Sequence, residues 1–305
     1  MDPIALIASL IVAATPLILA AIGELVVEKS GVLNLGVEGM MIIGAICGFI
    51  GAVTTGSPLI GFLTGTMGGA VISLTFGFVT QVFLSNQVAT GLALTLFGLG
   101  LSALLGHSYT GIRPPGTDAL LPESFTELPI LGRIFFSHDW VVYFALLMVA
   151  AVWWFLNRTR GGLILRAVGE SHDAAHALGY RVIAIRIAAI AFGGAMAGMG
   201  GAYLSLVRVP QWSEGMTAGI GWIALAIVVF ASWKPGRVVL GAWLFGGVTI
   251  LQLNLQAIGV DIPTAYLSMT PYLMTIIVLV IISSDRSRAA LNAPASLGRV
   301  FHASS

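Results

Sequence analysis

Long apolar runs dominate this chain, and most approach the roughly 20 residues that a helix needs to cross a lipid bilayer. They predict about nine membrane-spanning helices, within a range of about eight to ten. The expected spans are residues 4–22, 38–54, 59–84, 88–106, 139–157, 183–206, 217–232, 238–257 and 267–283. The pattern therefore predicts an all-α fold, a polytopic membrane helical bundle that forms one domain over residues 1–305.

The stretch around residues 24–38 interrupts this pattern because it is too polar for an ordinary span. Glu24, Glu28, Asn34 and Glu38 fall between two apolar runs or at the start of the second. Ionisable groups at membrane depth are costly, and irregular backbone is tolerated there only where protein buries it or a cavity holds water. We therefore expect a broken or re-entrant segment, which either lines a polar path or forms an interfacial loop with its charges in water.

A second polar stretch, residues 158–181, lies between two expected spans and holds four arginines and two acids. Ser171 is suited to cap a short helix, and Gly179 is suited to end it in a left-handed conformation. The helical repeat places three small or apolar side chains on one face: Ala174, Ala175 and Leu178. This helix is either a docking surface for another protein or a solvated loop that orients the chain by its charge.

The basic residues predict an orientation, because cytoplasmic loops of membrane proteins carry an excess of Lys and Arg. If residues 158–181 are cytoplasmic, alternation of the spans places 11 of the 14 basic residues in or near the cytoplasm. The N-terminus is then outside, and the proline-rich loop at 107–138 is external. The C-terminal tail at 284–305 is expected to be cytoplasmic.

Glycines recur at a spacing of four residues within the expected spans, at Gly61, Gly65 and Gly69 and again at Gly194 and Gly198. Small residues at this spacing let helix backbones approach closely where lipid provides no hydrophobic drive for association. We expect a closely packed bundle.

The composition supports the membrane class. Hydrophobic residues make up 57% of the chain and charged residues 9%, whereas soluble domains carry about 25% charged residues. A formal net charge of +1 gives no reason to expect nucleic acid as a partner. The single cysteine, Cys47, excludes an internal disulfide framework.

Two short motifs resemble ligand-binding signatures but lack a required residue. The stretch from Gly23 to Ser30 resembles a phosphate-binding P-loop, but Glu28 replaces the second glycine and would repel phosphate. His172 and His176 have the spacing of zinc ligands without the HExxH pattern. We therefore expect no catalytic residues, metal or cofactor in this chain.

Five stretches, taken in order, carry a family resemblance. They are SGVLNLGVEGMMIIGA (30–45), SNQVATGLALTLFGLGLS (85–102), GGLILRAVGESHDAAHALGY (161–180), GAWLFGGVTILQLNLQ (241–256) and PYLMTIIVLV (271–280). Together they resemble ABC-importer permeases of the branched-chain amino acid, ribose and nucleoside type. The likeness is closest to the shorter permease of nucleoside or simple-sugar importers.

The resemblance implies a non-catalytic subunit of the bacterial inner membrane that moves nucleosides by alternating access. Its implied partners are a second related permease, cytoplasmic ATPase subunits that bind the ATP, and an external substrate-binding lipoprotein. The implied ATPase-coupling residues are Arg166, Gly169, Glu170, Ala174, Ala175, Leu178 and Gly179. The implied substrate-pathway residues are Asn34, Glu38, Asn86, Gln87 and Thr90.

Other functions stay open at this point. A simple-sugar importer permease has the same architecture. A self-sufficient ion-coupled transporter calls for acids buried in the middle of a span, whereas Glu38 and Glu214 fall near expected span ends. An intramembrane scaffold or enzyme has no supporting motif.

Overall fold

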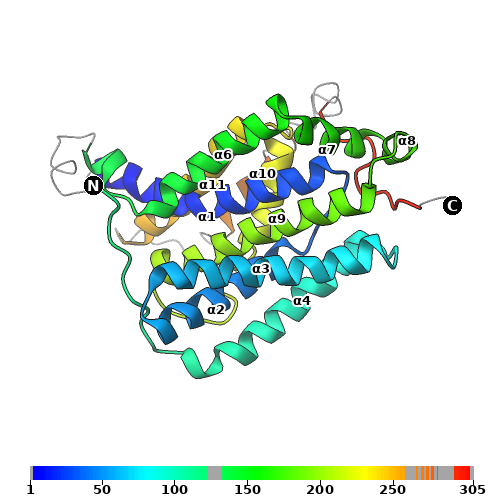
Figure 1. The fold of residues 1–305 in the computed structure, drawn as a ribbon. Helices are drawn as coiled ribbons and strands as arrows, with labels where there is room; N and C mark the ends of the chain where they lie inside the picture. Colours follow the sequence, from blue (N-terminus) through cyan, green and yellow to red (C-terminus); the bar gives the residue numbers. More distant parts are fainter. Residues whose placement is uncertain are drawn as a thin grey trace.

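The computed structural model describes residues 3–121, 132–257 and 292–302, together with isolated positions between 266 and 280. Within these ranges, seven helices are long and apolar enough to cross a membrane (Figure 1). They are α1 (Pro3–Lys29), α2 (Val37–Thr55), α3 (Pro58–Gln81), α4 (Gln87–Gly106), α6 (Trp140–Arg158), α9 (Val182–Tyr203) and α11 (Pro235–Ala257). The shorter elements are η1 (His107–Tyr109), η2 (Gly132–Phe136), α7 (Arg160–Glu170), α8 (His172–Ala177), η3 (Leu204–Arg208) and α10 (Ile220–Phe230). The predicted all-α bundle is confirmed.

One expected span is shorter than predicted. Other expected segments fall outside the described residues. The run at 217–232 gives only α10, whose 11 residues rise about 16 Å, roughly half of the hydrocarbon thickness. Residues 209–219 before it form turns and irregular backbone. The expected span at 267–283 and residues 122–131 of the expected external loop lie outside the described residues, apart from isolated positions.

The centre of the bundle is α1, which packs against α9, while α9 also packs against α2 and α3. The glycines at four-residue spacing lie in these contacts. A β-carbon on Gly198 would lie 2.4 Å from the Gly65 carbonyl oxygen and 2.8 Å from the Gly69 α-carbon. A β-carbon on Gly44 would lie 2.3 Å from the Gly198 α-carbon. The backbones of α2, α3 and α9 therefore touch, as the spacing predicts.

The predicted break near residues 24–38 is present and narrower than expected, because α1 continues through Lys29 and the chain turns only between α1 and α2. Gly31 has a φ of +88°, a left-handed conformation that favours glycine. The start of α2 then fixes the start of α10. The Glu38 carboxylate accepts hydrogen bonds from the Thr217 hydroxyl and from the Gly219 and Gly221 N–H groups. A carboxylate at this position satisfies free N–H groups and the positive end of the α10 dipole.

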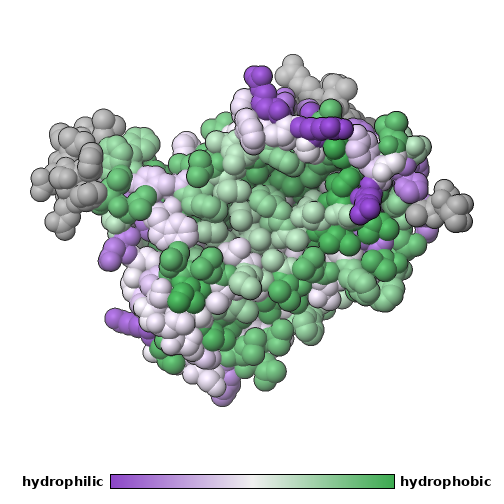
Figure 2. Space-filling model, viewed as in Figure 1, coloured by the Kyte–Doolittle hydropathy of each residue, from purple (hydrophilic) through white to green (hydrophobic). Residues whose placement is uncertain are grey.

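The face of the described bundle in Figure 2 is largely apolar, with hydrophilic residues gathered towards its two ends. Leu96, Leu104 and Met67 are 72%, 74% and 65% exposed on α4 and α3. Such a surface suits lipid or another membrane protein rather than water. The N-terminus and the α7–α8 segment lie at opposite ends of the bundle (Figure 1).

The glycine contacts generate a stability prediction. Gly198→Ala should lower the thermal unfolding midpoint, because the added methyl group meets backbone atoms that cannot rotate away, at a cost of about 1–3 kcal/mol. The matched control is Gly100→Ala on α4, where a β-carbon meets nothing within 4 Å. That change should leave the midpoint unchanged or raise it, because alanine favours a helix interior by roughly 0.5–1 kcal/mol. Equal effects at the two positions, measured in detergent, would contradict the packing described.

Candidate functional site

Local sequence forms the two short helices of the segment 158–181. The Thr159 hydroxyl oxygen accepts a hydrogen bond from Gly162 N–H at 3.0 Å and caps α7. The Ser171 hydroxyl oxygen accepts one from Ala174 N–H at 3.2 Å and caps α8. Gly179, with a φ of +86°, follows the end of α8. The predicted serine cap and left-handed glycine are both confirmed.

The faces of α8 differ from the prediction that Ala174, Ala175 and Leu178 share one surface. Ala174 and Leu178 are exposed, Leu178 at 76%, whereas Ala175 is 2% exposed and packs inward with Val168. Residues four apart lie on one face of a helix, and the residue next to the first is turned by about 100°. The exposed surface of α8 is therefore narrower than expected.

The other predicted coupling residues also include both exposed and buried positions. Glu170 and Gly179 are exposed, and Arg166 is partly buried. Gly169 is buried, since a β-carbon there would lie 2.2 Å from the Lys29 carbonyl oxygen. Gly169 thus holds α7 against the end of α1 instead of facing outward.

Arg186, near the start of α9, is fully buried and joins the segment to the bundle. Its guanidinium donates hydrogen bonds to acceptors in four other segments. These are the Ser30 carbonyl at 3.2 Å, Gln81 Oε1 at 3.4 Å, the Arg299 carbonyl at 3.2 Å and His172 Nδ1 at 3.3 Å. Because a guanidinium can only donate, His172 accepts at Nδ1 and carries its proton on Nε2, which lies 3.5 Å from Asp173 Oδ1.

The C-terminal residues 292–302 lie across the junction of α7, α8 and the α1–α2 turn. Ser296 donates from its N–H to the Gly169 carbonyl at 2.9 Å, and Gly298 N–H donates to the Gly31 carbonyl at 3.1 Å. The buried Phe301 ring packs edge-on against His172 and His176, with ring centroids 5.3 Å apart in both pairs. The described part of the tail is therefore part of the folded core at this end.

Each predicted pathway residue bonds a residue outside the predicted set. Gln87 Oε1 accepts from Leu33 N–H at 2.8 Å, and Asn34 Oδ1 accepts from Gly36 N–H at 3.0 Å. Asn86 is exposed and caps α4 through Ala89 N–H, while the Thr90 hydroxyl pairs with Ser85. The Glu38 carboxylate is likewise hydrogen-bonded, at the start of α10. Most of the polar atoms in the predicted set therefore already have partners in the protein.

Two buried polar atoms near this turn have no hydrogen-bond partner within the described part of the chain: Gln87 Nε2 and Glu24 Oε1. Glu24 and Glu28 are each 1% exposed inside α1, so these acids do not lie in water at a span end. Asn34 Nδ2 donates to Glu24 Oε2 at 3.4 Å, and Trp233 Nε1 donates to Glu28 Oε2. The interfacial-loop interpretation of these two acids is wrong, because α1 continues through both.

A separate cavity of about 610 Å³ lies towards the other end, between α1, η3, α10 and α11. Its lining is mixed, with polar groups on Ser9, His138, Arg208 and Thr249 among apolar side chains. A mixed lining of this kind is typical of sites for small polar molecules. No pattern in the sequence groups these four residues, since they come from four separate stretches.

Sequence reasoning also missed the residues that hold the α7–α8 segment. Arg186 could have been singled out from the sequence, because an ionisable residue within a membrane span usually has a structural or functional role. Ser296 and Phe301 could not, since one serine and one aromatic residue in a tail do not indicate what they contact.

The tail contacts generate a prediction about mobility. Phe301→Ala should increase hydrogen exchange of the α8 amides, because the ring packs against two side chains of that helix. The matched control is His302→Ala, since His302 is the exposed neighbour. Hydrogen exchange read by mass spectrometry on the full chain tests this, and unchanged α8 exchange in Phe301→Ala would show that the tail does not support the helix.

His172 generates a pH prediction. Burial, and then the Arg186 guanidinium, lower the pKa of His172, which Asp173 partly offsets and Arg299 lowers further. Below the unperturbed pKa of about 6.5, His172 in the unfolded chain therefore binds more protons than His172 in the folded chain. The stability that His172 contributes above that pH is lost as the pH falls. His172→Gln should thus reduce the fall in thermal midpoint between about pH 7.5 and about pH 5.5. Identical pH profiles for the wild-type protein and His172→Gln would exclude His172 as the titrating group.

Known transport proteins resemble this chain over most of its length. Residues 6–279 match the family model described as "Branched-chain amino acid transport system / permease component". A "Putative glucose ABC transporter permease protein" of Haloferax volcanii is 40% identical over 81% of this chain and 76% of its own length. A nucleoside ABC transporter permease of Lactococcus lactis is 32% identical over 90% of each chain. A guanosine ABC transporter permease of Bacillus subtilis is 32% identical over 88% of this chain and 89% of its own length.

A solved structure shows the fold in common with a transporter. It is described as "An inward-facing conformation of a putative metal-chelate type ABC transporter", with a TM-score of 0.50 and 14% sequence identity. The match covers 90% of this chain and 85% of that one. The family match extends over most of the sequence and over every spanning helix described above. This chain belongs to the branched-chain amino acid transport system permease family, and is a multi-pass, non-catalytic permease component of an ABC importer.

Proposed function

We propose that the chain carries nucleosides across the membrane by alternating access, paired with a second related permease. Two cytoplasmic ATPase subunits drive the pair, and an external binding lipoprotein delivers the cargo. The observation that carries the proposal is the capped α7–α8 segment, which presents exposed small and apolar residues while Arg186 and the tail fix its base. Rigid attachment suits a segment that transmits movement from a motor into the bundle.

The contact with the ATPase rests on the outward-facing members of the predicted set. Glu170, Ala174, Leu178 and Gly179 form this surface, with Arg166 at its edge. Gly169 and Ala175 act from inside by holding the two helices in place. A small side chain at position 174 permits close approach of a partner.

The orientation follows from the distribution of basic residues. Lys29, Lys234 and Arg237 lie at the end of the bundle that carries α7 and α8, whereas Arg208 lies towards the N-terminal end of α1. An excess of basic residues marks the cytoplasmic side. The N-terminus is then external and the tail cytoplasmic.

Both candidate cargoes, nucleosides and glucose, contain a ring that carries hydroxyl groups. Nucleoside permeases align with nearly the whole of this chain, and a glucose permease is the second candidate because one such relative reaches 40% identity. Gln87 Nε2, which has no hydrogen-bond partner among the described residues, and the mixed cavity at His138 and Thr249 supply hydrogen-bonding groups along the path. Asn34, Asn86 and Thr90 add polar groups near Gln87, whereas Glu38 acts by anchoring α10.

Reconstitution tests this function directly. The chain, its partner permease, the ATPases and the binding lipoprotein are placed in liposomes, and uptake of radiolabelled nucleosides and of glucose is compared with and without ATP. ATP-dependent nucleoside uptake that needs every subunit is the expected result. ATP-dependent uptake of glucose alone would reassign the cargo, and uptake by this chain alone without ATP would overturn the coupling.

The docking surface generates a prediction of its own. Ala174→Trp should abolish co-purification with the ATPase, because the indole occupies space on the exposed face of α8. Ala93→Trp, on the exposed surface of α4, is the matched control and should retain the ATPase. Both variants should insert and run as single species on gel filtration. Full ATPase recovery with Ala174→Trp would place the contact elsewhere.

A further inference from the structure

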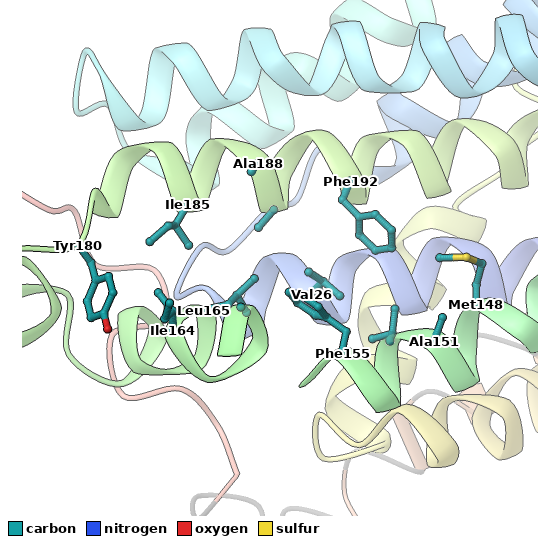
Figure 3. A pocket seen from close by; sticks show the side chains of 13 residues that line it. Val26, Met148, Ala151, Phe155, Ile164, Leu165, Tyr180, Ile185, Ala188 and Phe192 are labelled. Atoms are coloured by element: carbon teal, nitrogen blue, oxygen red, sulfur yellow. The ribbon is translucent and has the colours of Figure 1, made fainter. Parts of the chain in front are cut away.

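A crevice of about 520 Å³ opens on the side of the bundle between α6, α7 and α9, with α1 as its floor (Figure 3). Its lining is apolar apart from one phenol. Phe155 and Met148 come from α6, Leu165 from α7 and Phe192 from α9, while Tyr180 stands at one end (Figure 3). A cavity with so few hydrogen-bonding side chains does not suit a nucleoside or a sugar, because buried hydroxyl groups without partners are costly. It suits a hydrocarbon chain.

The part of the crevice that α6 lines lies within one leaflet of a bilayer. On α6 it extends from Met148 to Phe155, just before the charged end of that span at Arg158. Ten residues of helix separate Met148 from Arg158, a rise of about 15 Å. Half of the hydrocarbon thickness of a bilayer is also about 15 Å. An acyl chain that enters beside Arg158 therefore reaches the inner end of the crevice near the bilayer midplane.

Two exposed arginines adjoin lining residues of the crevice in the sequence. Arg160 precedes the lining residue Gly161, and Arg181 follows the lining residue Tyr180. Both arginines are exposed, and neither forms an ion pair with a carboxylate in the described part of the chain. They come from different elements, the start of α7 and the N-cap of α9. Basic residues between membrane helices at the water interface are suited to bind the phosphate of anionic lipids.

We propose that this crevice is a binding site for an anionic phospholipid. One acyl chain lies along Phe155, Phe192 and Met148, and the headgroup phosphate lies between Arg160 and Arg181. The site requires only that this end of the bundle lie at a membrane surface, so it does not depend on the nucleoside cargo or on the ATPase contact. A lipid held here packs against Leu165 of α7 and so supports the base of the coupling segment.

Photo-crosslinking on the full chain tests the site. The protein is placed in phosphatidylcholine nanodiscs with a trace of phosphatidylglycerol that carries a diazirine on its acyl chain, and crosslinked peptides are mapped by mass spectrometry. The expected crosslinks fall on the crevice segments of α6 and α9. Unlabelled phosphatidylglycerol should compete for them, and the same amount of unlabelled phosphatidylcholine should not.

Two pairs of variants separate the acyl and headgroup contacts. Ala188→Trp should fill the crevice and remove its crosslinks, whereas Ala150→Trp, on an exposed part of α6 outside the lining, should not. Arg160→Gln and Arg181→Gln should each reduce the preference for phosphatidylglycerol about fivefold. Arg237→Gln, an exposed arginine of α11 outside this crevice, is their control and should retain the preference.

Three results would overturn the proposal. Labelling spread evenly over the exposed surfaces of α3 and α4 would indicate ordinary surrounding lipid. Equal competition by the two lipids would remove the anionic headgroup contact. Crosslinks from the crevice to a second copy of the chain would make it a protein interface. The competition measurement uses the unaltered protein, so it decides the matter even if Ala188→Trp does not fold.

Discussion

A guanidinium without access to water must be satisfied by acceptors in the protein, and Arg186 imposes this requirement on one end of the permease. Burying a charge costs several kcal/mol, so each acceptor matters. The acceptors come from the α1–α2 turn, α3, α8 and the C-terminal tail. None of these segments can move far without leaving a buried donor unpaired. The arginine therefore links α8 to the core of the bundle.

Backbone contact between the spans also limits the movement of individual helices. The glycine surfaces of α2, α3 and α9 bring main chains together without intervening side chains. Closely packed elements shift as units because their contacts are not continuously deformable. We infer that movement within the permease concentrates where helices are short or interrupted. Within the described residues, the irregular stretch at 209–219 meets this condition, whereas the turn at 30–36 is held by Arg186.

Periodicity and local chemistry predicted much of the fold. The apolar runs predicted the spans because the thickness of the bilayer sets the length of a spanning helix. Ser171 and Gly179 predicted the ends of α8 because helix caps depend on neighbouring residues alone. The site was less predictable because its contacts join residues far apart in sequence. Arg186 reaches Arg299 across 113 positions, and Glu38 reaches Gly221 across 183. The inward turn of Ala175 likewise depends on Phe301, whose place no local pattern specifies.

The carboxylate of Glu38 has a consequence for the electrostatics of α10. Interrupted helices in transporters often direct the positive end of their dipole at an anionic cargo. At α10 that end is already paired from within, by a side chain of the same subunit. The N–H groups that open this helix are therefore occupied by the protein itself, and a free anion could bind them only by displacing Glu38.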